Sequence, residues 1–178
     1  MRPRADEILR SIAWTFDRYI SPDLHDPFAQ SLGLSIGYLL RSVEQRIQHE
    51  GPALWECNRA IRMPLELVRE LIAGSARARA ESVFTDLLGE IDAALGKEYR
   101  DPDDYPTLES LTDEAVGLRW PLTHAIEALQ QHPEAFDEIQ YTRTRAEIRD
   151  YLKLQLEREA AYVQIRSIEG LDPLGGRV

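Results

Sequence analysis

The sequence predicts an all-α protein, built as a helical bundle around a buried central helix and completed by a long C-terminal helix. Apolar residues recur at helical spacing, and no stretch between turn signals alternates as a β-strand does. The segment 28–40 carries no charge over 13 positions, in a chain where 29% of residues are charged. A helix that is apolar on every side is expected inside a protein, and this one is shorter than the roughly 20 residues that a bilayer requires.

Composition predicts a single domain over residues 1–178. The formal net charge of -10 and the pI near 4.9 argue against a protein that binds nucleic acid or an anionic membrane. The lone Cys57 excludes an internal disulfide, and the N-terminal residues lead into an amphipathic pattern rather than into a signal peptide. We therefore expect a cytoplasmic protein.

The expected helices begin and end at proline, glycine and serine. In chain order they span about 8–20, 27–50, 53–73, 76–98, 112–131 and 133–168. Helical spacing of apolar residues from Ile8 onward predicts the first, and Gly51-Pro52 closes the second. Pro64 interrupts the third, and Ser75 can cap the fourth.

An acidic loop, about 97–112, is expected before the fifth helix. The window 97–114 holds seven acidic and two basic groups. Two carboxylates directly after Thr112 suit the positive end of a helix dipole, so the helix is expected to begin there. Pro121 lies inside this helix and should bend its axis.

The last helix is predicted to be unusually long. Over residues 133–168 it would measure about 54 Å, whereas a compact chain of this size has a radius of gyration of only about 16 Å. It is therefore expected either to break at 141–144 or to extend beyond the domain. The tail 170–178 should be frayed.

Apolar residues form a wide arc along this last helix. Leu152, Leu156 and Val163 belong to it and are the candidate interface residues. The helix could lie across its own bundle, or the arc could be the seam of a homodimer. The sequence leaves both alternatives open.

Residues that carry catalytic or metal chemistry are sparse. No two of the four histidines lie within seven residues of each other, and the Glu-x-x-His motif of di-iron bundles is absent. Phosphate loops, nucleophile elbows and paired cysteines are also missing, so we expect no metal and no cofactor. Cys57 is expected to be a buried, inert thiol. A site that combines His124 and His49 with carboxylates remains the enzymatic alternative.

Small residues on the central helix suggest a place for a small apolar or acyl ligand. Ser31 and Ser35 alternate with two glycines there, which would allow close approach. The candidate ligand-binding residues are Trp14, Gly33, Gly37, Trp55, Trp120 and His124.

A basic patch stands out in this acidic chain. Its members, which could bind a phosphate, a carboxylate or an acidic loop of another subunit, are Arg59, Arg62, Arg69, Arg77 and Arg79. The alternative is that they form ordinary solvated helix faces.

The first 50 residues carry a family resemblance. Its residues are Arg2-Pro3, Ala5, Glu7, Ile8-Leu9, Phe16, Pro22 and Leu24, followed by the small and apolar spacing of 29–47. In these the chain resembles a family of small helical bacterial proteins of unknown function, encoded beside aminoglycoside-phosphotransferase-like kinases and acyl-CoA dehydrogenases. The resemblance implies an accessory role near acyl-thioester or alcohol catabolism and no catalytic residue. The chain lacks the Asn-Pro that such proteins carry near the C-terminus.

Three functions follow from these observations. The first is a non-catalytic accessory protein that forms a homodimer or docks on a partner enzyme. The second is a helical bundle that binds a small apolar or acyl ligand. The third is an enzyme that uses His124 and His49.

Overall fold

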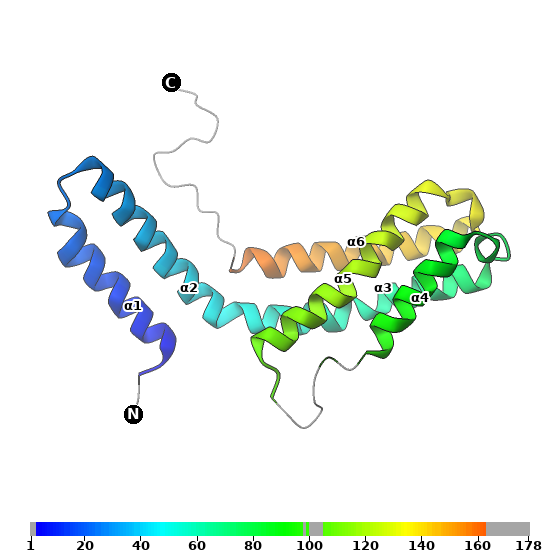
Figure 1. The fold of residues 1–178 in the computed structure, drawn as a ribbon, viewed down its shortest axis with the longest axis horizontal. Coiled ribbons are helices and arrows are strands. Elements are labelled where there is room, and N and C mark those ends of the chain that lie inside the picture. The colour runs from blue at the N-terminus through cyan, green and yellow to red at the C-terminus, as the bar shows by residue number, and fades with distance from the viewer. Residues whose placement is uncertain (1–2, 98, 100–104, 163–178) are drawn as a thin grey trace, which may run out of the picture. The chain divides into compact units, whose positions relative to one another are not determined.

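The computed structural model describes residues 3–97, 99 and 105–162. Its α-helices are α1 (Ala5–Thr15), α2 (Pro27–Ala60), α3 (Arg62–Gly74), α4 (Ser82–Gly96), α5 (Leu108–Gln131) and α6 (Glu138–Ala160) (Figure 1). A π-helical turn at Phe16–Ile20 and 3-10 turns at Ser21–Asp23, Ala78–Ala80 and Pro133–Ala135 connect them. No strand occurs among the described residues, and the predicted all-α fold with a long C-terminal helix is confirmed. None of the described helices is long and apolar enough to cross a membrane.

The chain divides into two compact units, where the sequence predicts one domain. The first comprises residues 1–50 and 159–178, and the second comprises residues 51–158. Helix α2 contributes to both, since its first 24 residues belong to the first unit and its remainder belongs to the second. Each unit is considered by itself below.

The first unit is a helical hairpin of α1 and the first part of α2, which lie antiparallel (Figure 1). Two ion pairs join the helices, Arg10 to Glu44 and Arg41 to Asp17, each at 2.7 Å. Gly33 leaves room for the segment that connects the helices, because a Cβ atom there would lie 2.7 Å from the Leu24 side chain. The hairpin is thus closed by small residues and polar links.

The predicted burial of the central helix is wrong for this structure. Phe28, Leu34 and Leu39 are 72%, 67% and 59% exposed, and only Gly33 and Gly37 of the segment 28–40 are buried. The physical reason is the number of neighbours. Helix α1 covers only the glycine side of α2. The uncharged segment 28–40 therefore lies in a two-helix hairpin, and most of its circumference is exposed.

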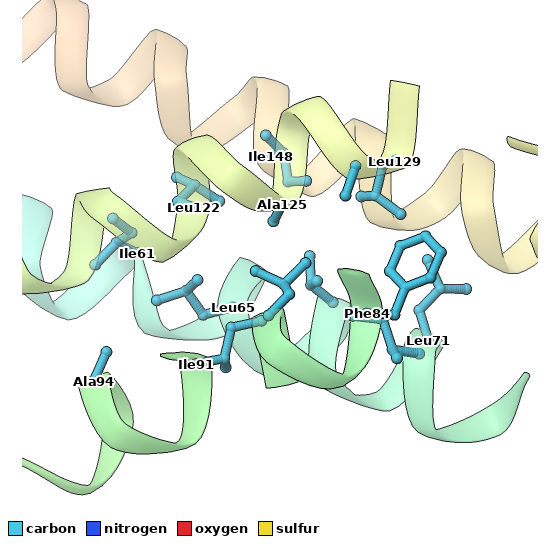
Figure 2. Packing of buried hydrophobic residues seen from close by; sticks show 14 of the residues in the cluster. Ile61, Leu65, Leu71, Phe84, Ile91, Ala94, Leu122, Ala125, Leu129 and Ile148 are labelled. Carbon is cyan, nitrogen blue, oxygen red and sulfur yellow. The ribbon is translucent and has the colours of Figure 1, made fainter. Parts of the chain in front are cut away.

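The second unit encloses the main hydrophobic core. Helices α3, α4, α5 and α6 direct apolar side chains toward one another (Figure 2), and Cys57 at the end of α2 belongs to the same cluster. Phe84, Ile91 and Leu118 are fully buried there, and Ile148 and Tyr151 of α6 belong to the same cluster. This core fixes the side of each helix that faces inward, and it leaves the opposite sides for polar contacts.

Several helix ends differ from the prediction. Helix α2 continues through Gly51-Pro52 and ends at Ala60, so the break lies at Ile61 rather than at Pro64. Helix α4 begins only at Ser82, because the preceding turn is 3-10.

The caps explain the remaining differences. Ser75 caps the 3-10 turn, since its hydroxyl accepts a hydrogen bond from the Ala78 N–H. Helix α5 begins four residues earlier than expected because Thr107, rather than Thr112, is the cap, and its hydroxyl accepts the Ser110 N–H at 3.1 Å. Asp137 accepts hydrogen bonds at the start of α6, so the predicted helix 133–168 breaks before this residue rather than at 141–144.

Candidate functional site

A buried polar network lies where α2, α3 and α5 meet. The Glu114 carboxylate is 2% exposed and accepts a hydrogen bond from Arg62 Nη2 at 2.8 Å. Asn58 donates from Nδ2 to the Leu111 carbonyl at 2.8 Å and to Glu114 Oε2 at 3.4 Å, and Arg62 also donates to the Leu95 carbonyl. The charge of Glu114 is therefore compensated, and this network acts as a clamp between helices rather than as an open site.

Tyr99 completes this region. Burial raises the pKa of the Tyr99 hydroxyl, while the nearby Arg62 lowers it and Glu114 raises it further. A Cβ atom at Gly117 would collide with that hydroxyl, so α5 needs a glycine where the tyrosine ring packs.

An open cleft lies between α4 and α5. Its volume is about 260 Å³, and its lining residues are Val83, Asp86, Leu87, Glu90, His124, Glu127, Ala128 and Gln131. His124 Nδ1 lies 2.7 Å from Glu90 Oε2, and the Trp120 ring meets the His124 ring edge to face at 4.7 Å. A carboxylate on Nδ1 orients the imidazole and leaves Nε2 for a ligand or for proton transfer. Three carboxylates in the lining make the cleft favourable for a cationic group.

Sequence reasoning identified His124 but missed Glu90, which lies 34 residues earlier in the chain. Only the packing of α4 against α5 brings the two side chains together. No group of three or more His, Cys, Asp or Glu residues in the described part of the chain could hold a metal ion. Cys57, the single cysteine of the chain, is buried as expected.

The predicted ligand-binding residues divide between the two units. Trp14 packs against Tyr19 in the hairpin, with ring centroids 5.6 Å apart. The glycine face is filled by Phe16, Leu24 and the Arg41 side chain, and it leaves no room for a ligand against Gly33 and Gly37. In the second unit, Trp120 and His124 meet beside the α4–α5 cleft. Trp55 lies on α2 and does not line that cleft.

Most side chains of the basic patch make contacts within the fold. Arg62 pairs with Glu114, and Arg69 lies 3.6 Å from Asp92. Arg77 and Arg79 donate to the backbone carbonyls of Glu134 and Ser75, and Arg59 is exposed. The structure does not gather these residues into an anion site.

The predicted interface residues of the last helix are only partly described. Leu152 lines a small cavity of about 100 Å³ between α5 and α6, and Leu156 is exposed. Val163 lies outside the described residues. His49 belongs to the hairpin and His124 to the second unit, so the predicted pair is not assembled within either unit.

The largest unexplained feature is an apolar surface on the hairpin, which we call the hairpin face. It consists of Ile8, Ile12, Phe28, Leu32, Ile36, Leu39, Val43 and Ile47, each between 44% and 72% exposed. The α2 members are spaced by three and four residues, so they form one stripe along the helix. The sequence predicted burial for the four members within 28–40, because an uncharged apolar segment indicates that it needs to be covered and does not indicate what covers it.

Comparison of the chain with protein-family models, with curated proteins and with solved structures finds no match.

Proposed function

We propose that this chain is a non-catalytic interaction protein whose hairpin face binds a protein partner. The single observation that carries the proposal is the exposure of that face. Large, contiguous apolar surfaces on water-facing helices mark sites of protein association. A two-helix hairpin also has too little interior of its own to offset the entropy of ordering it.

Features of the second unit support the same proposal. Its buried carboxylate is held in a structural pair, Arg62 with Glu114. Its core is closed by five helical segments and needs no further cover. We propose that the second unit is a stable helical body and that the hairpin supplies the binding surface. A cytoplasmic, bacterial setting and an accessory role beside a partner enzyme are parts of this proposal.

The test is co-purification from the source cells with a tagged chain in three forms. These are the unaltered chain, Leu39→Lys on the hairpin face, and Leu34→Lys as a matched control. Leu34 belongs to the same helix and is similarly exposed, but it lies on the other side of the hairpin. We expect the unaltered chain and Leu34→Lys to retain one partner protein, which is either a different protein or a second copy of this chain. Leu39→Lys should lose that partner. Identical bound proteins in all three forms would refute the proposal.

An enzyme or small-ligand protein that uses the α4–α5 cleft is the second candidate. The observation that favours it is the 2.7 Å contact between His124 and Glu90 beside a cleft of about 260 Å³. NMR screening with small amines and carboxylic acids tests it. Ligands of this cleft should shift the His124 resonances, and Glu90→Ala should weaken their binding, whereas binding that ignores Glu90 would exclude the cleft.

A further inference from the structure

We infer that the partner of the hairpin face is a second copy of this chain, and that two hairpins pack face to face into a four-helix bundle. The inference rests on the proposed function, because it assigns an occupant to the surface on which that function depends. Four observations on the hairpin carry it: the repeat of the stripe, its continuation onto α1, its area and its charge.

The stripe on α2 repeats every 11 residues. Phe28, Leu32 and Ile36 are followed at the same intervals by Leu39, Val43 and Ile47. Eleven residues make just over three whole turns, so the stripe stays on one side of a nearly straight helix instead of winding around it. A straight stripe about 28 Å long is suited to packing along the whole length of another helix.

Helix α1 widens the stripe into a face. The buried side of each helix, which marks the contact line, contains Ala13 in α1 and Gly33 and Gly37 in α2. Ile8 and Ile12 are rotated from this line by about a third of a turn, in the same sense as the α2 stripe. Two antiparallel helices turned in the same sense present these residues on one side of the hairpin.

The area of the hairpin face is close to the interface area that a stable dimer requires. Eight side chains of this size, each about half exposed, present roughly 800 Å² of apolar surface, which is about what each partner gives to a standard interface. An isologous contact uses the same patch on both copies, so one face of this size is sufficient. Two paired helices from each copy then make the four-helix arrangement that buries such stripes.

The charge distribution permits two such faces to meet. No charged residue occurs from Phe28 to Leu40, and serines flank the stripe there. Several charged residues of the hairpin form ion pairs within it, such as Arg10 with Glu44 and Arg46 with Glu50. Self-association therefore brings no like charges together at the centre of the contact, where charge is usually depleted.

Sedimentation equilibrium of the purified full chain tests the inference. The monomer has a mass of 20.4 kDa, and we expect twice that mass at tens of micromolar, as for interfaces of standard size. Leu39→Lys should weaken the dimer at least tenfold, since it places two charges in one symmetric contact. Leu34→Lys should leave the dissociation constant unchanged. Circular dichroism checks helix content, and Phe28→Lys replaces Leu39→Lys if that variant does not fold.

The outcomes separate this inference from the proposed function. A monomer at every concentration, or equal weakening by Leu39→Lys and Leu34→Lys, overturns self-association through this face. If the chain is monomeric and still loses a co-purifying protein on Leu39→Lys, the partner is a different protein and the proposed function stands. If the chain is monomeric and Leu39→Lys lowers its melting temperature instead, the face is covered within one chain and both conclusions fall.

Discussion

Large apolar side chains are buried in the second unit of this chain and exposed in the hairpin. In the second unit, Phe84 and Leu118 are completely buried among five helical segments. In the hairpin, the buried residues are Asp6, Ala13, Gly33 and Gly37, and no large apolar side chain is among them. The difference shows that the apolar spacing of a helix indicates how much of its surface needs to be buried. The number of neighbouring helices determines how much of that surface is buried.

The largest contrast is expected from truncating one leucine in each unit. Leu118→Ala should lower the free energy of unfolding by about 2–5 kcal/mol, because it leaves a cavity in a closed core. Leu39→Ala should cost less than about 1 kcal/mol in dilute protein, where its side chain already meets water. Urea unfolding of both variants checks this, and equal losses would mean that the hairpin face is buried in the single chain.

Removal of an ion pair should likewise lower the free energy of unfolding more in the second unit than in the hairpin. Glu114→Ala removes a buried carboxylate from Arg62, which is itself about two-thirds covered, and should cost about 2–3 kcal/mol. Asp17→Ala removes an exposed partner of Arg41 and should cost between about 0 and 1 kcal/mol. Thermal unfolding of the two variants measures the difference. A larger loss for Asp17→Ala would show that the hairpin depends on its polar links more than the second unit does.

Glycine replacements should have opposite signs in the two units. Gly33→Leu forces a side chain against Leu24 and Phe16 and should destabilise the hairpin by about 1–3 kcal/mol. Gly89 lies exposed in the middle of α4 with nothing within 4 Å of a Cβ atom. Gly89→Leu should therefore stabilise α4 by about 0.5–1 kcal/mol through helix propensity. Melting temperatures that move in the same direction would contradict this packing.

The smallest expected effect is an alkaline sensitivity confined to the second unit. The pKa of Tyr99 is raised, chiefly by burial, so the folded chain holds this proton more tightly than the unfolded chain. The resulting stability is fully present below the ordinary tyrosine pKa and is lost as pH rises through the raised one. Tyr99→Phe should flatten the decline in unfolding free energy above about pH 10. An unchanged slope would show that other groups cause the decline.

Part of this architecture is predictable from sequence. Helical spacing and turn residues predict the all-α fold, the break between the first two helices and the long last helix. The helix start at Thr107 was missed because Thr112 offered an equally plausible cap, and only the hydrogen bond distinguishes them. The start at Asp137 was missed because Pro133 also suits the first turn of a helix. The burial of 28–40 was mispredicted because an uncharged helix looks the same whether its cover lies within the chain or in a partner.

The candidate sites were less predictable than the fold. Trp120 and His124 lie one turn apart on α5, so sequence spacing alone brings them together. Arg62 and Glu114 are 52 residues apart, and their contact depends on how α3 packs against α5. An isolated sequence therefore shows a basic patch where the folded chain has an internal ion pair.

Hydrogen exchange as a function of protein concentration tests the central claim most directly. Amides of 28–47 in the hairpin are compared with amides of 118–129 in α5, in the unaltered chain and in Leu39→Lys. We predict strong, concentration-independent protection in α5, because the second unit closes its own core. Protection of the hairpin should rise with concentration in the unaltered chain and stay low in Leu39→Lys, because binding stabilises the hairpin by mass action. Hairpin amides equally protected at all concentrations in both proteins would contradict the account.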